Sequence, residues 1–102
     1  MRKKKTVALL SAITVLGASA TALAATSYLE SGIWKHGTTG MFGGGEVYSE
    51  YVDWDHNWYT ATVINAKGKK VKDTETNGYT YATARTTAYS FKTDYTYYNY
   101  GN

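Results

Sequence analysis

The densest group of cationic side chains beyond the N-terminal segment falls within six positions: Lys67, Lys69, Lys70 and Lys72. Ammonium groups at this spacing can bind a phosphate or a pyrophosphate. Lys70 and Lys72 are expected on one face of a strand, because side chains alternate along β structure. The alternative is that lysines on an edge hairpin prevent association between sheets.

The two histidines, His36 and His56, stand near acidic residues, but no close ligand spacing supports a metal site. The run Asp53-x-Asp55-x-Asn57 has the start of a calcium-binding EF-hand loop. That loop requires Gly at its sixth position and Glu at its twelfth, where this chain has Trp58 and Ile64. We therefore expect a polar turn before a strand. The spacing of these residues therefore predicts no metal and no cofactor. No Gly-x-Ser-x-Gly elbow is present, so we also expect no enzymatic activity.

Four tyrosines lie near the C-terminus of the chain. Alternation places Tyr95 and Tyr97 on one face of a strand, and Tyr98 and Tyr100 on the other. One pair should enter the core. The other could stack on sugar rings or on a second copy of the protein, so that assembly into a homo-oligomer stays open.

Residues 1–24 have the organisation of a secretory signal peptide. A cationic start, Arg2 to Lys5, precedes an apolar run, and Ala22-x-Ala24 provides small residues for cleavage. We expect cleavage after Ala24, with Ala22 as the alternative position, and release of residues 25–102 as a secreted, extracellular domain. A membrane span would need about 20 apolar residues, more than this run offers.

Cleavage would change the charge of the protein. The eleven cationic residues fall to seven against eight acids, so the net charge moves from +3 to −1. The basic balance therefore belongs to the precursor and does not indicate a nucleic-acid partner. No cysteine is available for disulfides, and aliphatic side chains are few, whereas three Trp and eleven Tyr follow the leader. The core must then be largely aromatic.

The pattern of residues 25–102 favours an all-β domain, a small antiparallel β-sandwich of about six short strands without disulfides. Strands are expected over residues 46–52, 58–65, 69–76, 79–86, 87–92 and 95–100. Residues 65–68 fit a three-residue hairpin loop that ends in a left-handed glycine. Asn77-Gly78 is the strongest signal for a two-residue hairpin, and a last hairpin is expected at Thr93-Asp94. Residues 37–45 are expected to form a flexible loop.

Gly32-Ile33-Trp34-Lys35-His36-Gly37 resembles the Gly-x-Trp-x-His-Gly opening of lactococcin 972-type bacteriocins. Further similar elements follow in the family's order. They are residues 47–51, His56 with residues 60–63, residues 72–74, residues 81–84 and residues 97–100. The chain departs from the family pattern at Tyr81, where the family has Trp, and at its final Gly101-Asn102.

This resemblance implies a cysteine-free β-sandwich that is exported and kills related Gram-positive bacteria. The implied target is lipid II, or another cell-envelope component, with septum formation blocked. Trp34 is expected to supply a stacking face and His36 a hydrogen-bond donor, against the alternative that Trp34 is a core residue. The candidate target-binding residues are Trp34, His36, His56, Lys70, Lys72, Tyr98 and Tyr100. The competing hypothesis is a secreted glycan-binding or surface-binding module that kills nothing.

Overall fold

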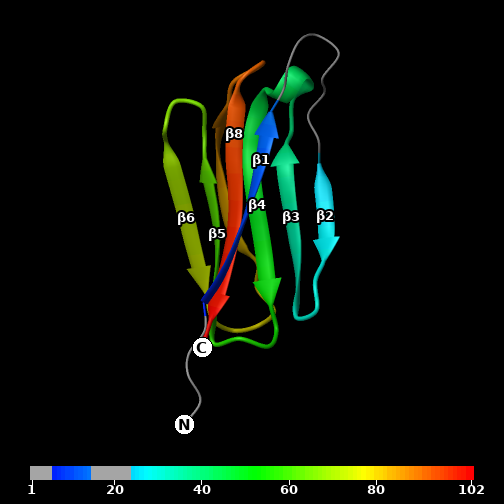
Figure 1. The fold of residues 1–102 in the computed structure, drawn as a ribbon, viewed down its shortest axis with the longest axis vertical. Coiled ribbons are helices and arrows are strands. Elements are labelled where there is room, and N and C mark those ends of the chain that lie inside the picture. The colour runs from blue at the N-terminus through cyan, green and yellow to red at the C-terminus, as the bar shows by residue number, and fades with distance from the viewer. Residues whose placement is uncertain (1–5, 15–23) are drawn as a thin grey trace.

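The computed structural model describes residues 6–14 and 24–102. These residues form eight strands and one short 3-10 helix, η1 (Met41–Gly43) (Figure 1). The strands are β1 (Thr6–Thr14), β2 (Ala25–Tyr28), β3 (Gly32–Thr38), β4 (Gly45–Asp53), β5 (Trp58–Ile64), β6 (Lys70–Glu75), β7 (Ala82–Ala88) and β8 (Thr93–Gly101).

The strands make two antiparallel sheets that pack face to face. The first sheet has the order β1-β8-β5-β6 and the second has the order β2-β3-β4-β7. The expected all-β antiparallel sandwich is thereby confirmed. Eight strands are present where six were expected. β1, β2 and β3 are additional, and the strand predicted over residues 87–92 is wrong, because Thr87 and Ala88 complete β7 and residues 89–92 connect it to β8.

The hairpin between β5 and β6 forms where the sequence predicts it. Gly68 has a φ of 84°, and its backbone N–H donates to the Asn65 carbonyl at 2.8 Å. The Asn65 side-chain oxygen also accepts from the backbone N–H groups of Lys67 and Lys69. This turn fixes a register in which Thr62 lies opposite Lys72.

The hairpin predicted at Asn77-Gly78 is wrong. The segment instead carries the chain from β6, which pairs with β5, across to β7, which pairs with β4 in the other sheet. A type I′ turn needs positive φ at both central residues, but here only Gly78 has it, at 85°. Its N–H donates to the hydroxyl of Tyr59, a buried core residue, so this loop is held by long-range contacts.

Two further expectations are corrected at the ends of other strands. The predicted C-terminal hairpin at Thr93-Asp94 does not form, because β7 and β8 belong to different sheets. The expected loop over residues 37–45 is shorter, since Gly37 and Thr38 complete β3 and Met41–Gly43 forms η1. The segment from Gly32 forms β3, which lies between β2 and β4.

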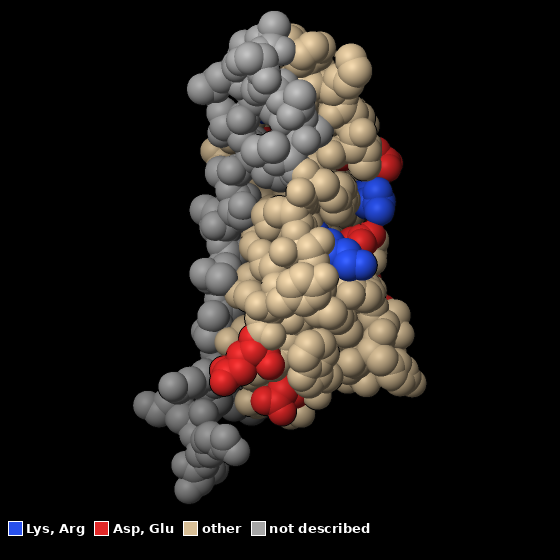
Figure 2. Space-filling model, turned by 90° about the vertical axis from the view of Figure 1, so that its right-hand side faces the viewer, with Lys and Arg blue, Asp and Glu red and all other residues tan. Residues whose placement is uncertain are grey.

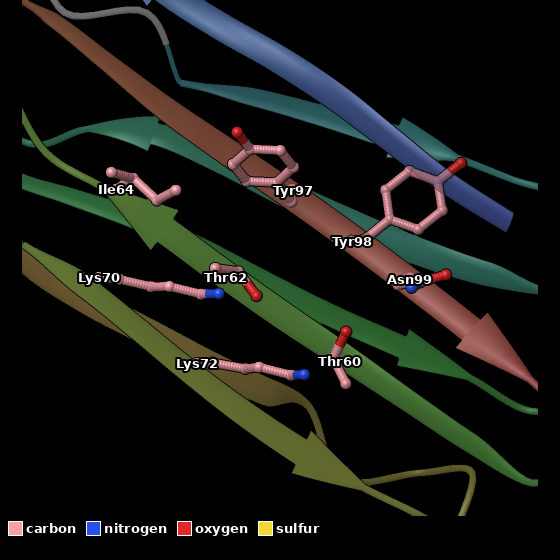
Figure 3. A pocket seen from close by; sticks show the side chains of 8 residues that line it. All are labelled: Thr60, Thr62, Ile64, Lys70, Lys72, Tyr97, Tyr98 and Asn99. Carbon is pink, nitrogen blue, oxygen red and sulfur yellow. The ribbon is translucent and has the colours of Figure 1, made fainter. Parts of the chain in front are cut away.

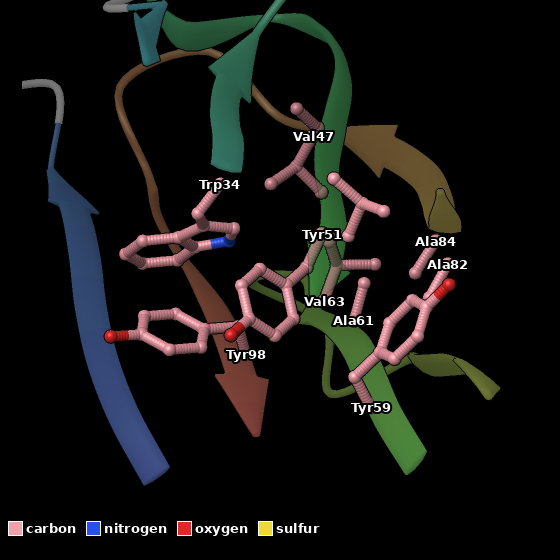
Figure 4. Close-up of a cluster of buried hydrophobic side chains, with 11 residues drawn as sticks. Trp34, Val47, Tyr51, Tyr59, Ala61, Val63, Ala82, Ala84 and Tyr98 are labelled. Carbon is pink, nitrogen blue, oxygen red and sulfur yellow. The ribbon is translucent and has the colours of Figure 1, made fainter. Parts of the chain in front are cut away.

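The core is aromatic, as the composition predicts (Figure 4). Tyr51 and Tyr59 are fully buried and meet edge to face, with ring centroids 5.9 Å apart. Tyr98 bridges the sheets: its ring lies 4.5 Å from that of Tyr51 and 4.7 Å from that of Trp34. Aromatic pairs at these distances stabilise a core beyond the area that they bury.

Part of the expected signal peptide belongs to the first sheet. β1 pairs with β8 along its whole length, from Thr6 opposite Gly101 to Thr14 opposite Thr93. Residues 1–5 and 15–23 of the expected leader, including the alternative cleavage position Ala22, lie outside the described residues. Ala24 and Ala25, which flank the expected cleavage point, are exposed at the start of β2.

Candidate functional site

A cationic groove crosses the outer face of the first sheet (Figure 3). Lys70 and Lys72 extend from β6 towards β5, where Thr60 and Thr62 form the floor. The groove has a volume of about 280 Å³. Its lining comes from three adjacent strands and consists of Thr60, Thr62, Ile64, Lys70, Lys72, Tyr97, Tyr98 and Asn99.

Among the residues that the structure describes, no carboxylate lines this groove. Within the described part of the chain, neither Lys70 nor Lys72 forms an ion pair, and the nearby Asp73 accepts instead from the Thr83 backbone N–H at 2.9 Å. Both ammonium groups are therefore free to bind an anion. The threonine hydroxyls and the Asn99 amide add neutral hydrogen-bond donors beside the two charges.

A second hollow opens at one end of the sandwich, around His56. It has a volume of about 350 Å³ and is lined by Leu29, Glu30, Ser31, Tyr51, Asp55, His56, Tyr98 and Tyr100. The His56 ring lies against the Tyr100 ring, with centroids 3.9 Å apart. His56 Nδ1 lies 2.9 Å from both side-chain oxygens of Asp53.

Asp53 is fully buried but well supplied with hydrogen-bond donors. The Tyr51 hydroxyl donates to Oδ2 at 2.5 Å, and the backbone N–H groups of Asp55 and His56 donate to Oδ1. Burial alone would raise the pKa of Asp53, but these bonds and His56 lower it below the ordinary value. The carboxylate is thus ionised and can only accept, so His56 donates from Nδ1 and keeps Nε2 for a ligand.

This arrangement differs from a nucleophilic triad. The Ser31 hydroxyl donates to Asp53 Oδ2 at 3.2 Å and not to His56, whereas a serine nucleophile must give its proton to the histidine. Among residues 24–102 and 6–14, no three His, Asp or Glu side chains are placed to hold a metal ion. The groups around His56 are suited to hydrogen bonding with a ligand rich in hydroxyl and N–H donors.

Trp34 and His36 lie inside the sandwich. Their rings stack with centroids 3.8 Å apart, and Trp34 is 5% exposed. The indole N–H donates to Ser49 Oγ at 2.9 Å. Burial lowers the pKa of His36, which is therefore neutral at physiological pH. With its ring covered in this way, Trp34 fits the packing alternative better than the ligand-stacking role.

The predicted site residues thus separate into three places. Lys70 and Lys72 line the groove, His56 and Tyr100 line the hollow, and Trp34 with His36 packs in the core. Tyr98 is largely buried but borders both the groove and the hollow. Of the alternating tyrosines, Tyr98 and Tyr100 are the pair that faces inward.

Sequence reasoning missed the groove floor and the partner of His56. The register of the Gly68 hairpin would have placed Thr62 opposite Lys72, with Thr60 on the same face two residues further along β5, opposite Thr74. The i, i+3 spacing of Asp53 and His56 gave a weaker signal for their contact, because the sequence does not show that the Asp53 carboxylate is buried.

No protein-family model, curated protein or solved structure matches the chain. No helix within the described ranges is long and apolar enough to cross a membrane.

Proposed function

We propose that this protein is a secreted antibacterial protein of the lactococcin 972 type that binds the cell-wall precursor lipid II. Binding would block cell-wall synthesis at the septum of related Gram-positive bacteria. The observation that carries the proposal is the groove in which Lys70 and Lys72 stand over Thr60 and Thr62 without a neighbouring carboxylate. The resemblance of the Gly32–Gly37 segment supports the same conclusion.

The groove suits a pyrophosphate. Two ammonium groups would offset its charge, while hydroxyl and amide groups would bond its remaining oxygens. Tyr97 lies on the same outer face of β8 and offers a ring to the first sugar. The protein acts by binding in this proposal and carries out no covalent step.

The His56 hollow suits hydroxyl and amide groups of a sugar or a peptide. It offers His56 Nε2 and the exposed carboxylates of Glu30 and Asp55 as hydrogen-bonding groups, together with the ring of Tyr100. These features equally favour a second candidate, a glycan-binding module that is not lethal. A growth-inhibition assay with the purified protein separates the two, because only the first function kills.

The proposal is tested by calorimetric titration of the protein with lipid II in detergent micelles. Replacing both lysines, Lys70→Gln and Lys72→Gln, should weaken binding about tenfold or more, since charge-assisted bonds to phosphate are lost. The matched control is Lys35→Gln on the second sheet, where the ammonium group lies 4.9 Å from the Tyr81 ring centroid. Equal affinity of the double variant and the control would exclude the groove as the phosphate site.

A further inference from the structure

One end of the sandwich gathers three loops around two phenylalanines. The Phe91 backbone N–H donates to the Phe42 carbonyl at 3.0 Å, which joins the loop after β3 to the loop before β8. Lys67 Nζ lies 4.8 Å from the Tyr89 ring centroid, which brings in the β5–β6 turn. We call this surface the phenylalanine tip; it consists of Met41, Phe42, Lys67, Tyr89, Phe91 and Lys92.

Both phenylalanines have a left-handed backbone. Phe42 has a φ of 55° and Phe91 a φ of 61°, and they are the only residues other than glycine with positive φ in the described ranges. Glycine would adopt this conformation without the steric cost that a Cβ brings. Strained residues that persist on a surface point to a function for their side chains.

The apolar side chains of this tip lie outside the core. The rings of Phe42 and Phe91 stack with centroids 5.3 Å apart, yet Phe91 remains 45% exposed and Met41 72% exposed. Beside them, Lys67 and Lys92 line a shallow depression with Tyr89 and Ala66. Apolar and aromatic side chains with lysines beside them are the composition of surfaces that enter the interface of a membrane.

We propose that the phenylalanine tip docks on an anionic lipid bilayer. Met41 and Phe91 would enter the interface between headgroups and acyl chains, while Lys67 and Lys92 would meet lipid phosphates. This surface goes beyond the proposed function, because it needs only a bilayer and no cell-wall precursor. It would also bring the groove close to the membrane, since Lys70 directly follows the β5–β6 turn.

The charge distribution favours this orientation. The acid closest to the tip on β4, Glu46, is paired with Arg85 at 3.6 Å, and Asp94 is buried. The exposed acids Glu30 and Asp55 lie at the other end of the strands. On the face displayed in Figure 2, acidic side chains lie at that end, and others lie beside Lys and Arg side chains further along the strands. An anionic bilayer would therefore attract the tip and repel the opposite end.

The absence of cysteine allows a probe at a single position. The full chain is labelled with an environment-sensitive fluorophore at Met41→Cys and mixed with phosphatidylcholine vesicles containing phosphatidylglycerol. Entry into the interface should shift the emission to the blue. In the background Phe42→Gly with Phe91→Gly, the vesicle concentration at half-maximal shift should rise about tenfold, because two apolar side chains are lost. The glycines also relieve strain, so the melting temperature should not fall.

The matched control carries the same probe at Tyr79→Cys, an exposed aromatic position at the opposite end of the sandwich. Its emission should not change with vesicles. Increasing salt or the change Lys67→Glu with Lys92→Glu should weaken the shift at position 41. No shift at position 41, an equal shift at position 79, or self-association without vesicles would each overturn the proposal. An unchanged response in the double glycine variant would do so as well.

Discussion

Trp34 donates a 2.9 Å hydrogen bond to Ser49, and the Ser49 hydroxyl donates in turn to the Tyr97 carbonyl at 2.8 Å. This chain of two bonds links β3, β4 and β8, and so connects the two sheets through polar groups inside an aromatic core. The indole ring above it stacks on His36 and meets Tyr98. Trp34 therefore contributes both packing and a buried hydrogen bond.

Replacing this residue, Trp34→Ala, should lower the free energy of unfolding by about 3–5 kcal/mol, the scale of a truncated core aromatic. Chemical denaturation measures the loss. The matched control is Trp54→Ala, because that side chain is 56% exposed and its removal should cost less than about 1 kcal/mol. A near-native denaturation midpoint for Trp34→Ala, accompanied by lost killing, would restore the ligand-contact role.

The buried Asp53 should give the protein a distinct sensitivity to acid. Its folded-state pKa is lowered, so its contribution to stability is complete above the ordinary value of 3.8 and is lost as the pH falls through the folded value. The change Asp53→Asn should cost about 2 kcal/mol or more near pH 7, because bonds to a charged acceptor are weakened. It should also flatten the fall in stability below pH 4.

Stability measured by denaturation from pH 7 to pH 2 checks this expectation. Asp55→Asn is the control, since its carboxylate is exposed and belongs to the same loop. If both variants follow the same pH profile as the original protein, the Asp53 cluster does not govern acid stability.

A second buried carboxylate should behave in the opposite way. Asp94 Oδ1 accepts from the Ala66 N–H at 3.1 Å, but Oδ2 is buried and has no partner among the described residues. Burial raises the pKa of Asp94, so its unfavourable effect appears as the pH rises through the folded value. Asp94→Asn should therefore raise the free energy of unfolding by about 1 kcal/mol at pH 7.

The gain from Asp94→Asn should shrink at pH 3, where the original carboxyl is protonated. The comparison variant is Asp94→Ala, which also removes the acceptor for Ala66 and should destabilise the protein. A loss of stability in the asparagine variant at pH 7 would show that the charge of Asp94 is used by the fold.

These residues show what the sequence could reveal and what it could not. The Gly68 hairpin was predictable because its turn and both of its strands are local. The Asn77-Gly78 segment carries equally strong local signals, but the partner of the following strand is chosen by the core, where Tyr59 and Ala82 are buried. The alternation of side chains along the last strand correctly predicted that Tyr98 and Tyr100 share one face. Which pair faced inward depended on Trp34 and Tyr51 in the other sheet.

The site was predictable to a similar extent. Lys70 and Lys72 were identified from charge and alternation, which are local properties. The role of His56 depends on the buried Asp53, and that burial comes from the packing of Tyr51 and Ser31 around the carboxylate. The strain at Phe42 and Phe91 had no sequence signal, since nothing in their residue type suggests a left-handed backbone.

Removal of the expected leader should change the edge of the first sheet. If the secreted protein begins at Ala25, it lacks β1, and β8 becomes an edge strand with its outer hydrogen-bonding groups open to solvent. The first sheet would then have three strands facing the four strands of the second. Intact mass establishes the N-terminus, and amide hydrogen exchange compares the secreted protein with the uncleaved chain.

Protection should fall for alternate amides of β8, those that face β1 in the uncleaved chain, because neighbouring residues of a strand point their N–H groups to opposite sides. Amides of the β5–β6 hairpin provide the internal control, since this pairing does not involve β1. Their protection should stay the same. Retention of residues 1–24 in the secreted protein would contradict the expected cleavage. Equal loss of protection in β5 and β6 would show instead that β1 is required for the whole sandwich to fold.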